Sequence, residues 1–149
     1  MLKDLSSKGI YTITDDMKKL LCDFDGEYSP ENEVFEVIKK YYEECGYVMD
    51  THTAVAACGN LKYKEKTGDD TVSVVVSTAS PYKFTRSVMK AIAPECELED
   101  DFEMIKELSS LAKVAIPNAI KQIMDAKILH DTVCKVEEME SSVIDFLSL

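Results

Sequence analysis

Hydrophobic residues recur at helical spacing through most of the chain. Between residues 31 and 45, Val34, Phe35, Ile38, Tyr41 and Tyr42 recur at helical spacing. Residues three or four apart share one face of an α-helix, so this pattern predicts an amphipathic helix. The same reasoning, limited by helix breakers, predicts helices over residues 15–22, 30–45, 52–66, 82–92, 99–111, 116–126 and 136–147.

Residues that favour helix ends support these limits. Thr14 can cap the helix from residue 15, and Asp50-Thr51 can cap the helix from residue 52. Ser29-Pro30 supplies a capping hydroxyl followed by a proline at the first helical position. Gly46 follows the second of these helices, and the sequence predicts a left-handed cap there.

The segment Thr71–Val76 has the clearest strand pattern. Its consecutive valines do not alternate with polar residues, which indicates a strand buried on both faces, as in a parallel sheet between helices. Tyr47–Met49 is a second, shorter candidate. The predicted class is therefore helix-rich α/β, with about seven helices and few strands in a single domain over residues 1–149. So little sheet is unusual for a complete α/β domain, and we expect the missing strands to come from sequence outside this chain.

The net charge argues against two classes of partner. The chain carries 28 acidic residues against 17 basic ones, a formal charge of −11, and Arg86 is its only arginine. Nucleic acids and anionic membranes both require a concentrated basic surface, so neither is an expected partner.

Cysteine usage and hydropathy bear on the compartment. The five cysteines are odd in number, widely spread and contain no C-x-x-C pair, which favours reduced thiols over disulfides or a zinc site. No metal ligands are predicted. No apolar run approaches the roughly 18 residues of a membrane span, and no signal core follows the N-terminus. We expect a cytoplasmic protein and, because the chain starts without a strand or a glycine-rich opening, we also expect an internal fragment.

Hydroxyl side chains gather where the predicted strand ends. Ser77, Thr78 and Ser80 follow it directly and precede a predicted helix. Ligands of open α/β sheets bind beyond the carboxyl ends of strands, and helix N-termini favour anions. The cluster therefore predicts a ligand site, although the same hydroxyls could simply cap the helix.

Two blocks of the sequence resemble the C-terminal region of threonine synthases. Ser77–Phe84, read S-T-A-S-P-Y-K-F, is similar to that family's S/T-A-x-P-x-K-F signature. Tyr47–Ala56 resembles its D-P-H-T-A-V-A block, with Thr51 in place of the proline. The spacing of the two blocks also agrees, and the resemblance spans nearly the whole chain.

The resemblance implies a fold like that of the tryptophan synthase β subunit and a pyridoxal-phosphate enzyme. Threonine synthases convert O-phosphohomoserine and water into threonine and phosphate. By resemblance, Thr78 meets the pyridine nitrogen of the cofactor, with Ser77 beside it. A neutral hydroxyl stabilises a protonated ring nitrogen less than a carboxylate would, so the ring should stay largely unprotonated. We expect this weaker electron sink to limit side reactions such as transamination.

The resemblance also suggests that His52, Thr53 and Lys83 line the substrate site. His52 could instead cap or pack, and Lys83 could be structural or lie near a phosphate or carboxylate. The family's Schiff-base lysine belongs to an N-terminal motif that this chain lacks. The glycine-rich loop that would hold the cofactor phosphate is also absent from this sequence. No catalytic residue is therefore assigned here, and we expect the isolated fragment to be inactive without the N-terminal remainder of the enzyme.

Two other classes remain open at the level of sequence. One is a non-catalytic, acidic interaction module that reuses the fold, and the other is a thiol or metal protein built on the cysteines. Both an enzyme fragment and an interaction module would expose apolar surface, so self-association is expected of either. A longer reading frame carrying a lysine motif upstream would favour the enzyme, and metal analysis would test the third class.

Overall fold

The computed structural model describes residues 1–148, and the regular secondary structure in that range is all helical. Within that range it has eight α-helices, two short 3₁₀ helices and no β-strand. The elements are α1 (Leu2–Lys8), α2 (Asp15–Lys19), α3 (Glu31–Cys45), α4 (Thr51–Thr67), η1 (Pro81–Phe84), α5 (Thr85–Ile92), α6 (Asp101–Ala112), α7 (Asn118–Met124), η2 (Val136–Glu138) and α8 (Met139–Leu147). Contacts divide the chain into two units, Met1–Ile116 and Pro117–Leu149.

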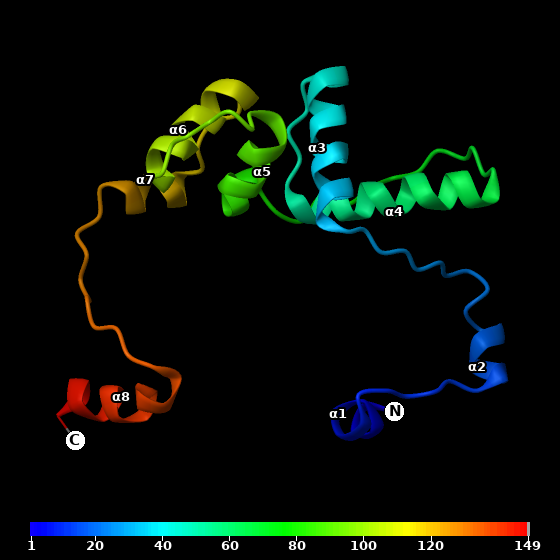
Figure 1. Ribbon diagram of the computed structural model, residues 1–149, viewed down its shortest axis with the longest axis horizontal. Helices are drawn as coiled ribbons and strands as arrows, with labels where there is room; N and C mark the ends of the chain where they lie inside the picture. Colours follow the sequence, from blue (N-terminus) through cyan, green and yellow to red (C-terminus); the bar gives the residue numbers. More distant parts are fainter. Residues whose placement is uncertain (149) are drawn as a thin grey trace. The chain divides into compact units, whose positions relative to one another are not determined.

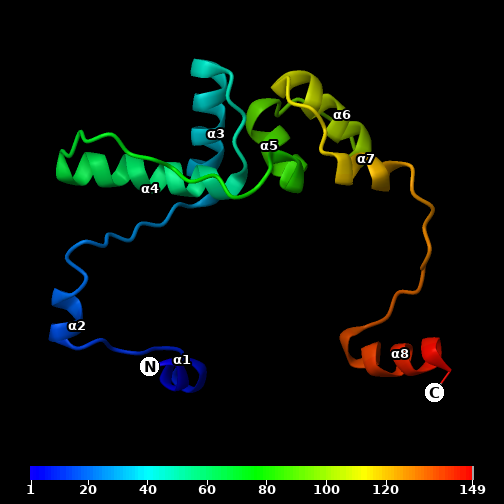
Figure 2. The same ribbon diagram turned by 180° about the vertical axis from the view of Figure 1, so that it is seen from behind.

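The core of the first unit lies among four helices. Helix α3 packs against both α4 and α5, and α5 packs against α6, as both ribbon views show (Figures 1 and 2). Ile38 of α3, Val88 of α5 and Leu108 of α6 are completely buried. Ile38 is one of the positions whose spacing predicted the helix over residues 30–45, so helical periodicity identifies part of this core correctly.

Several of the predicted helix ends are confirmed, and others are wrong. Thr14 accepts a hydrogen bond from the backbone N–H of Met17 at 3.3 Å, and Gly46 ends α3 in the left-handed region at φ 67°. Ser29 does not cap α3, because Pro30 takes the N-cap position and the buried Ser29 hydroxyl has no hydrogen-bond partner within residues 1–148. The helix predicted over residues 15–22 ends at Lys19, and α1 was not predicted.

The predicted strands are not present among the described residues. Val72, Val74 and Val76 are 93%, 85% and 70% exposed, so the expected burial of this segment is wrong. The segment returns beside α4 without regular structure (Figure 1). A strand needs a neighbouring strand for its backbone hydrogen bonds, and residues 1–148 supply none. Tyr47–Met49 is also irregular, although Val48 and Met49 are buried.

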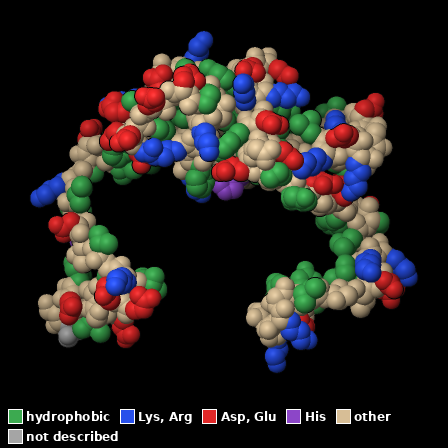
Figure 3. Space-filling model, viewed as in Figure 1, with side chains coloured by type: hydrophobic (Ala, Val, Ile, Leu, Met, Phe, Trp, Pro, Cys, Tyr) green, Lys and Arg blue, Asp and Glu red, His purple; other side chains and the backbone are tan. Residues whose placement is uncertain are grey.

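The second unit buries very little. Neither α7 nor α8 has a buried residue. The apolar stripe predicted on the last helix is present but exposed, and it consists of Met139, Val143, Phe146 and Leu147. Figure 3 shows hydrophobic side chains at the surface of α8 and of the segment before it. Among the described helices, none is long and apolar enough to cross a lipid bilayer.

Candidate functional site

The candidate site is built around the N-terminus of α4. Asp50 is the N-cap residue, and its Oδ1 accepts hydrogen bonds from the backbone N–H groups of His52 at 2.9 Å and Thr53 at 3.2 Å. Aspartate favours this position because its short carboxylate reaches the unpaired N–H groups of the first turn. The residue is 1% exposed, which is rare for an acid and requires that its oxygens be well supplied with donors.

Two hydroxyl groups complete the environment of this carboxylate. The Thr53 hydroxyl donates to Asp50 Oδ2, and the Ser77 hydroxyl donates to the same oxygen at 3.4 Å. Thr53 Oγ1 and Ser77 Oγ lie 2.9 Å apart. Ser77 is 27 residues from Asp50 in sequence, so this cluster fastens the segment after the valines to the start of α4.

The same contacts set the charge state of Asp50. Burial alone would raise the pKa of its carboxyl group, because it disfavours the charged form. Hydrogen bonds from the Thr53 hydroxyl, from the backbone N–H groups of Thr53 and His52, and the nearby His52 imidazole outweigh burial. The pKa of Asp50 is therefore lowered from its ordinary value, and the group is a carboxylate at neutral pH.

This lowered pKa predicts a pH-dependent contribution to stability. A carboxyl group with a lower pKa in the folded state stabilises that state above its unfolded pKa, roughly 4, and stops doing so as the pH falls through the folded pKa. Asp50→Asn should therefore reduce the free energy of unfolding at pH 7, and the gap from wild type should close below about pH 4. Urea unfolding between pH 2.5 and 7 measures this, and a gap that does not change with pH would contradict it.

His52 lies beside the carboxylate and faces solvent on its other side. Its Nδ1 is 3.3 Å from Asp50 Oδ1, and its side chain is 56% exposed. The imidazole ring also contacts the ring of Phe84, with centroids 5.3 Å apart. Lys83 Nζ lies 5.6 Å from the centroid of that same Phe84 ring. Phe84 therefore brings His52 and Lys83, from two separate blocks of the sequence, to one place.

Thr78 is exposed at the edge of this cluster. Its hydroxyl makes no hydrogen bond with any residue of the described range 1–148. The residues around it are held, since Ser77 binds Asp50 and Ser80 accepts a hydrogen bond from the N–H of Tyr82 at 3.3 Å. Ser80 therefore caps η1, in agreement with the alternative that these hydroxyls cap the following helix. The Thr78 hydroxyl keeps a donor and an acceptor available.

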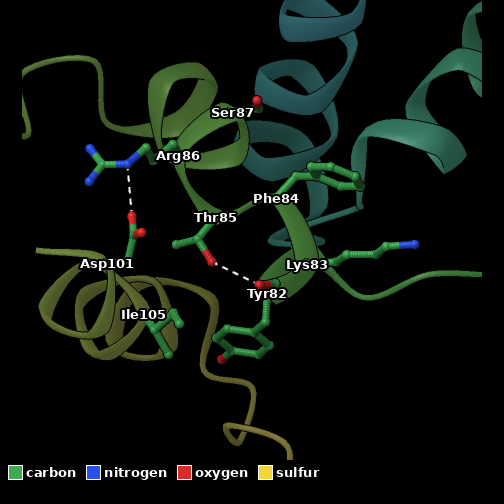
Figure 4. Close-up of a pocket in the computed structure, with 8 residues that line it drawn as sticks. All are labelled: Tyr82, Lys83, Phe84, Thr85, Arg86, Ser87, Asp101 and Ile105. Carbon is green, nitrogen blue, oxygen red and sulfur yellow. Dashed lines mark hydrogen bonds and ion pairs between the residues drawn. The ribbon is translucent and has the colours of Figure 1, made fainter. Parts of the chain in front are cut away.

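A depression of about 340 Å³ lies on the other side of η1, between the start of α5 and α6. Figure 4 shows Arg86 and Asp101 paired across it, and their Nε and Oδ1 atoms are 2.7 Å apart. The Lys83 side chain points away from this pair (Figure 4). The guanidinium of Arg86 also donates to the carbonyl of Glu99. The charge of Arg86 is thus already paired with Asp101. This depression is therefore a weaker candidate for a ligand site than the cluster around Asp50 and Thr78.

The thiols and acids form no further site in the part of the chain that the structure describes. All five cysteines are free thiols there, and only Cys58 is buried. Over residues 1–148, no group of three histidine, cysteine or acidic side chains could hold a metal ion.

The structure thus gathers most of the residues singled out from the sequence. Ser77, Thr53 and His52 share the carboxylate of Asp50, and Lys83 joins them through Phe84. Sequence reasoning missed the central role of Asp50, which it treated as a helix cap only. The capping pattern was a correct signal, but a contact with a hydroxyl 27 residues away is invisible without coordinates.

Comparisons with known proteins agree with one another. The family model described as "Threonine synthase, C-terminal" matches residues 53–144. Threonine synthase of Schizosaccharomyces pombe is 39% identical over 72 residues, covering 48% of this chain and 14% of that protein. The Saccharomyces cerevisiae threonine synthase is 35% identical over 100 residues, covering 61% and 20%. Human "Threonine synthase-like 1" is 32% identical over 77 residues, covering 51% and 10%. The chain spans a fifth or less of the length of these relatives.

Proposed function

The chain belongs to the threonine synthase family, and from that premise we propose that it forms the C-terminal part of an enzyme that converts O-phosphohomoserine and water into threonine and phosphate. The observation that carries the proposal is the Thr78 hydroxyl, which is exposed and unpaired within the described residues, inside the stretch that matches the family. A group that must meet a ligand has to be available in this way.

We propose that the valine segment completes a sheet whose other strands belong to the rest of the enzyme. In the fold of the tryptophan synthase β subunit, which the family resembles, helices cover a sheet on both faces. The exposure of Val72, Val74 and Val76 supports this, because residues with strong strand preference and unpaired backbone groups are suited to receive neighbouring strands. The chain would then belong to the large cofactor-binding domain.

The residues present fit the ring-nitrogen side of pyridoxal phosphate. The cofactor supplies an electron sink for carbanions formed on the amino-acid substrate. Thr78 would donate its hydroxyl hydrogen bond to the ring nitrogen, and Ser77 would form the adjoining wall with its own hydroxyl held by Asp50 and Thr53. A neutral donor leaves the ring nitrogen unprotonated, because it offers no negative charge to stabilise the pyridinium.

Three further residues are proposed to line the substrate side. His52 and Thr53 begin α4 beside Ser77, and Lys83 reaches the same neighbourhood through the ring of Phe84. The Lys83 ammonium group offers donors to the phosphate or carboxylate of an amino-acid substrate, and the exposed imidazole of His52 offers a polar ring nitrogen beside it. They would orient the substrate in front of Thr78.

We propose that this chain alone is inactive, because the lysine that anchors the cofactor belongs to the remainder of the enzyme. After incubation with pyridoxal phosphate and removal of the excess, the isolated chain should retain no stoichiometric cofactor absorbance. A stable band at one cofactor per chain would contradict this proposal.

The reaction itself is tested with the longer protein that contains this chain. Purified with pyridoxal phosphate and supplied with O-phosphohomoserine, it should release phosphate and threonine in equal amounts. The same protein stripped of the cofactor serves as the control. Phosphate release without threonine, or no reaction with a full complement of cofactor, would overturn the proposed function.

A further inference from the structure

Asp50 makes more contacts than capping a helix requires. Asp100 is a natural comparison, because its Oδ1 caps α6 by accepting the N–H groups of Phe102 and Glu103, both at 2.9 Å. Asp100 is exposed, and the groups that donate to its side chain belong to its own helix. Asp50 is buried and adds the hydroxyls of Thr53 and Ser77 and the imidazole of His52 to the same two backbone bonds.

We propose that Asp50 is the positioning residue of the site: its carboxylate fixes Ser77, and through Ser77 the hydroxyl of Thr78, and it also orients the imidazole of His52. The inference rests on the proposed function, since Thr78 and His52 need fixed positions only if they face a cofactor and a substrate. Asp50 itself touches neither, because its side chain is fully buried.

The effect of Asp50 on Thr78 depends on how few contacts hold the valine segment. Residues 72–79 have no regular structure, and their alternate valines face solvent. Near the start of the segment, Lys64 Nζ donates to the carbonyl of Thr71 at 2.9 Å. At its end, the cluster of Asp50, Thr53 and Ser77 is the attachment next to Thr78. Removing that attachment should increase the motion of Thr78.

The second action concerns the two nitrogens of His52. Asp50 Oδ1 faces Nδ1 at 3.3 Å, so a proton on Nδ1 is favoured electrostatically and Nε2 keeps its lone pair. Lys83 is a charged group that approaches Phe84, the ring with which His52 is in contact. Asp50 thereby presents Nε2 as a hydrogen-bond acceptor on the exposed side of the imidazole.

Nitrogen-15 NMR of the full chain tests both actions, with Asp100→Asn as the matched control for Asp50→Asn. Asparagine still caps a helix, so α4 should remain in Asp50→Asn. The order parameters of the Ser77 and Thr78 amides should fall from about 0.85 to below about 0.6. The neutral His52 ring should shift about threefold toward the tautomer protonated on Nε2. Asp100→Asn should change neither signal, and with two histidines in the sequence the assignment is direct.

Ser77→Ala separates positioning from folding. It removes one donor and leaves the α4 cap intact, so Thr78 should become mobile while the His52 tautomer stays as in wild type. If Asp50→Asn unfolds α4, the mobility of Thr78 in Ser77→Ala tests the proposal instead. A rigid Thr78 in Ser77→Ala, unchanged signals in a folded Asp50→Asn, or equal effects in Asp100→Asn would each overturn the proposal.

The same variants in the longer enzyme separate this inference from the proposed function. Ser77→Ala should weaken cofactor binding about tenfold and shift the cofactor absorption band, because a mobile Thr78 would donate less well to the ring nitrogen. An enzyme that makes no threonine but shows the NMR changes would refute the proposed function and leave the positioning intact. An enzyme that makes threonine without those changes would refute the positioning alone.

Discussion

Replacing Thr78 by valine should lower kcat/KM of the complete enzyme for O-phosphohomoserine by about ten- to a hundredfold. Valine keeps the size and β-branching of threonine and removes only the hydroxyl. Leaving a ring nitrogen without its donor in a closed site costs about 1–3 kcal/mol, and each 1.4 kcal/mol changes a rate about tenfold. Phosphate release measured over a range of substrate concentrations gives the value.

Two further variants make this result specific to the hydroxyl. Thr78→Ser restores a donor at the same position and should recover most of the activity. Ser73→Ala removes an exposed hydroxyl from the same segment, which donates to the carbonyl of Thr71 at 3.5 Å, and should leave activity unchanged. Full activity in Thr78→Val would exclude Thr78 as the partner of the ring nitrogen.

Replacing Leu108 by alanine should lower the free energy of unfolding of the first unit by about 3 kcal/mol. Leu108 is completely buried on α6, which packs against α5, and deleting its terminal carbons removes apolar contacts and leaves a cavity. A small domain has only about 5–15 kcal/mol of stability, so this single change removes a large share. Urea unfolding monitored by circular dichroism measures the change.

Leu20→Ala is the matched control for this measurement. Leu20 is 77% exposed in the turn after α2, so its truncation should change stability by less than about 0.5 kcal/mol. Equal effects of the two substitutions would mean that α6 is not packed against α5 in solution. Helix α6 carries Asp101, the partner of Arg86 beside η1, so loosening α6 should also disturb the region that follows Thr78.

The helices were predictable because their signals are local. Val34 and Ile38 are four residues apart and both buried on α3, and Gly46 and Asp50 end or begin helices where the sequence placed them. Such patterns depend on residues within a turn or two of one another. The tertiary structure then buries these apolar faces where neighbouring helices pack against one another.

The strand and the centre of the site were not predictable for the opposite reason. The valines of 72–76 have the composition of a buried strand, but burial requires partner strands that residues 1–148 do not contain. The role of Asp50 depends on Ser77, which approaches it only after α4 and the returning segment are in place. Periodicity and capping patterns carry no information about such distant contacts. The resemblance to threonine synthases indicated Ser77, Thr53 and His52, but its motif does not state which side chain joins them.

The exposed valine segment has a consequence for handling the chain by itself. Thr71–Val76 contains six uncharged residues, five of them with high strand propensity, and no proline, which is the composition of cross-β spines. When the segment is solvent-exposed, copies of it on different molecules can pair with one another. A concentrated solution of the chain should therefore form thioflavin-positive fibrils. A lysine in place of Val74 should slow their growth, because stacked strands would bring like charges together.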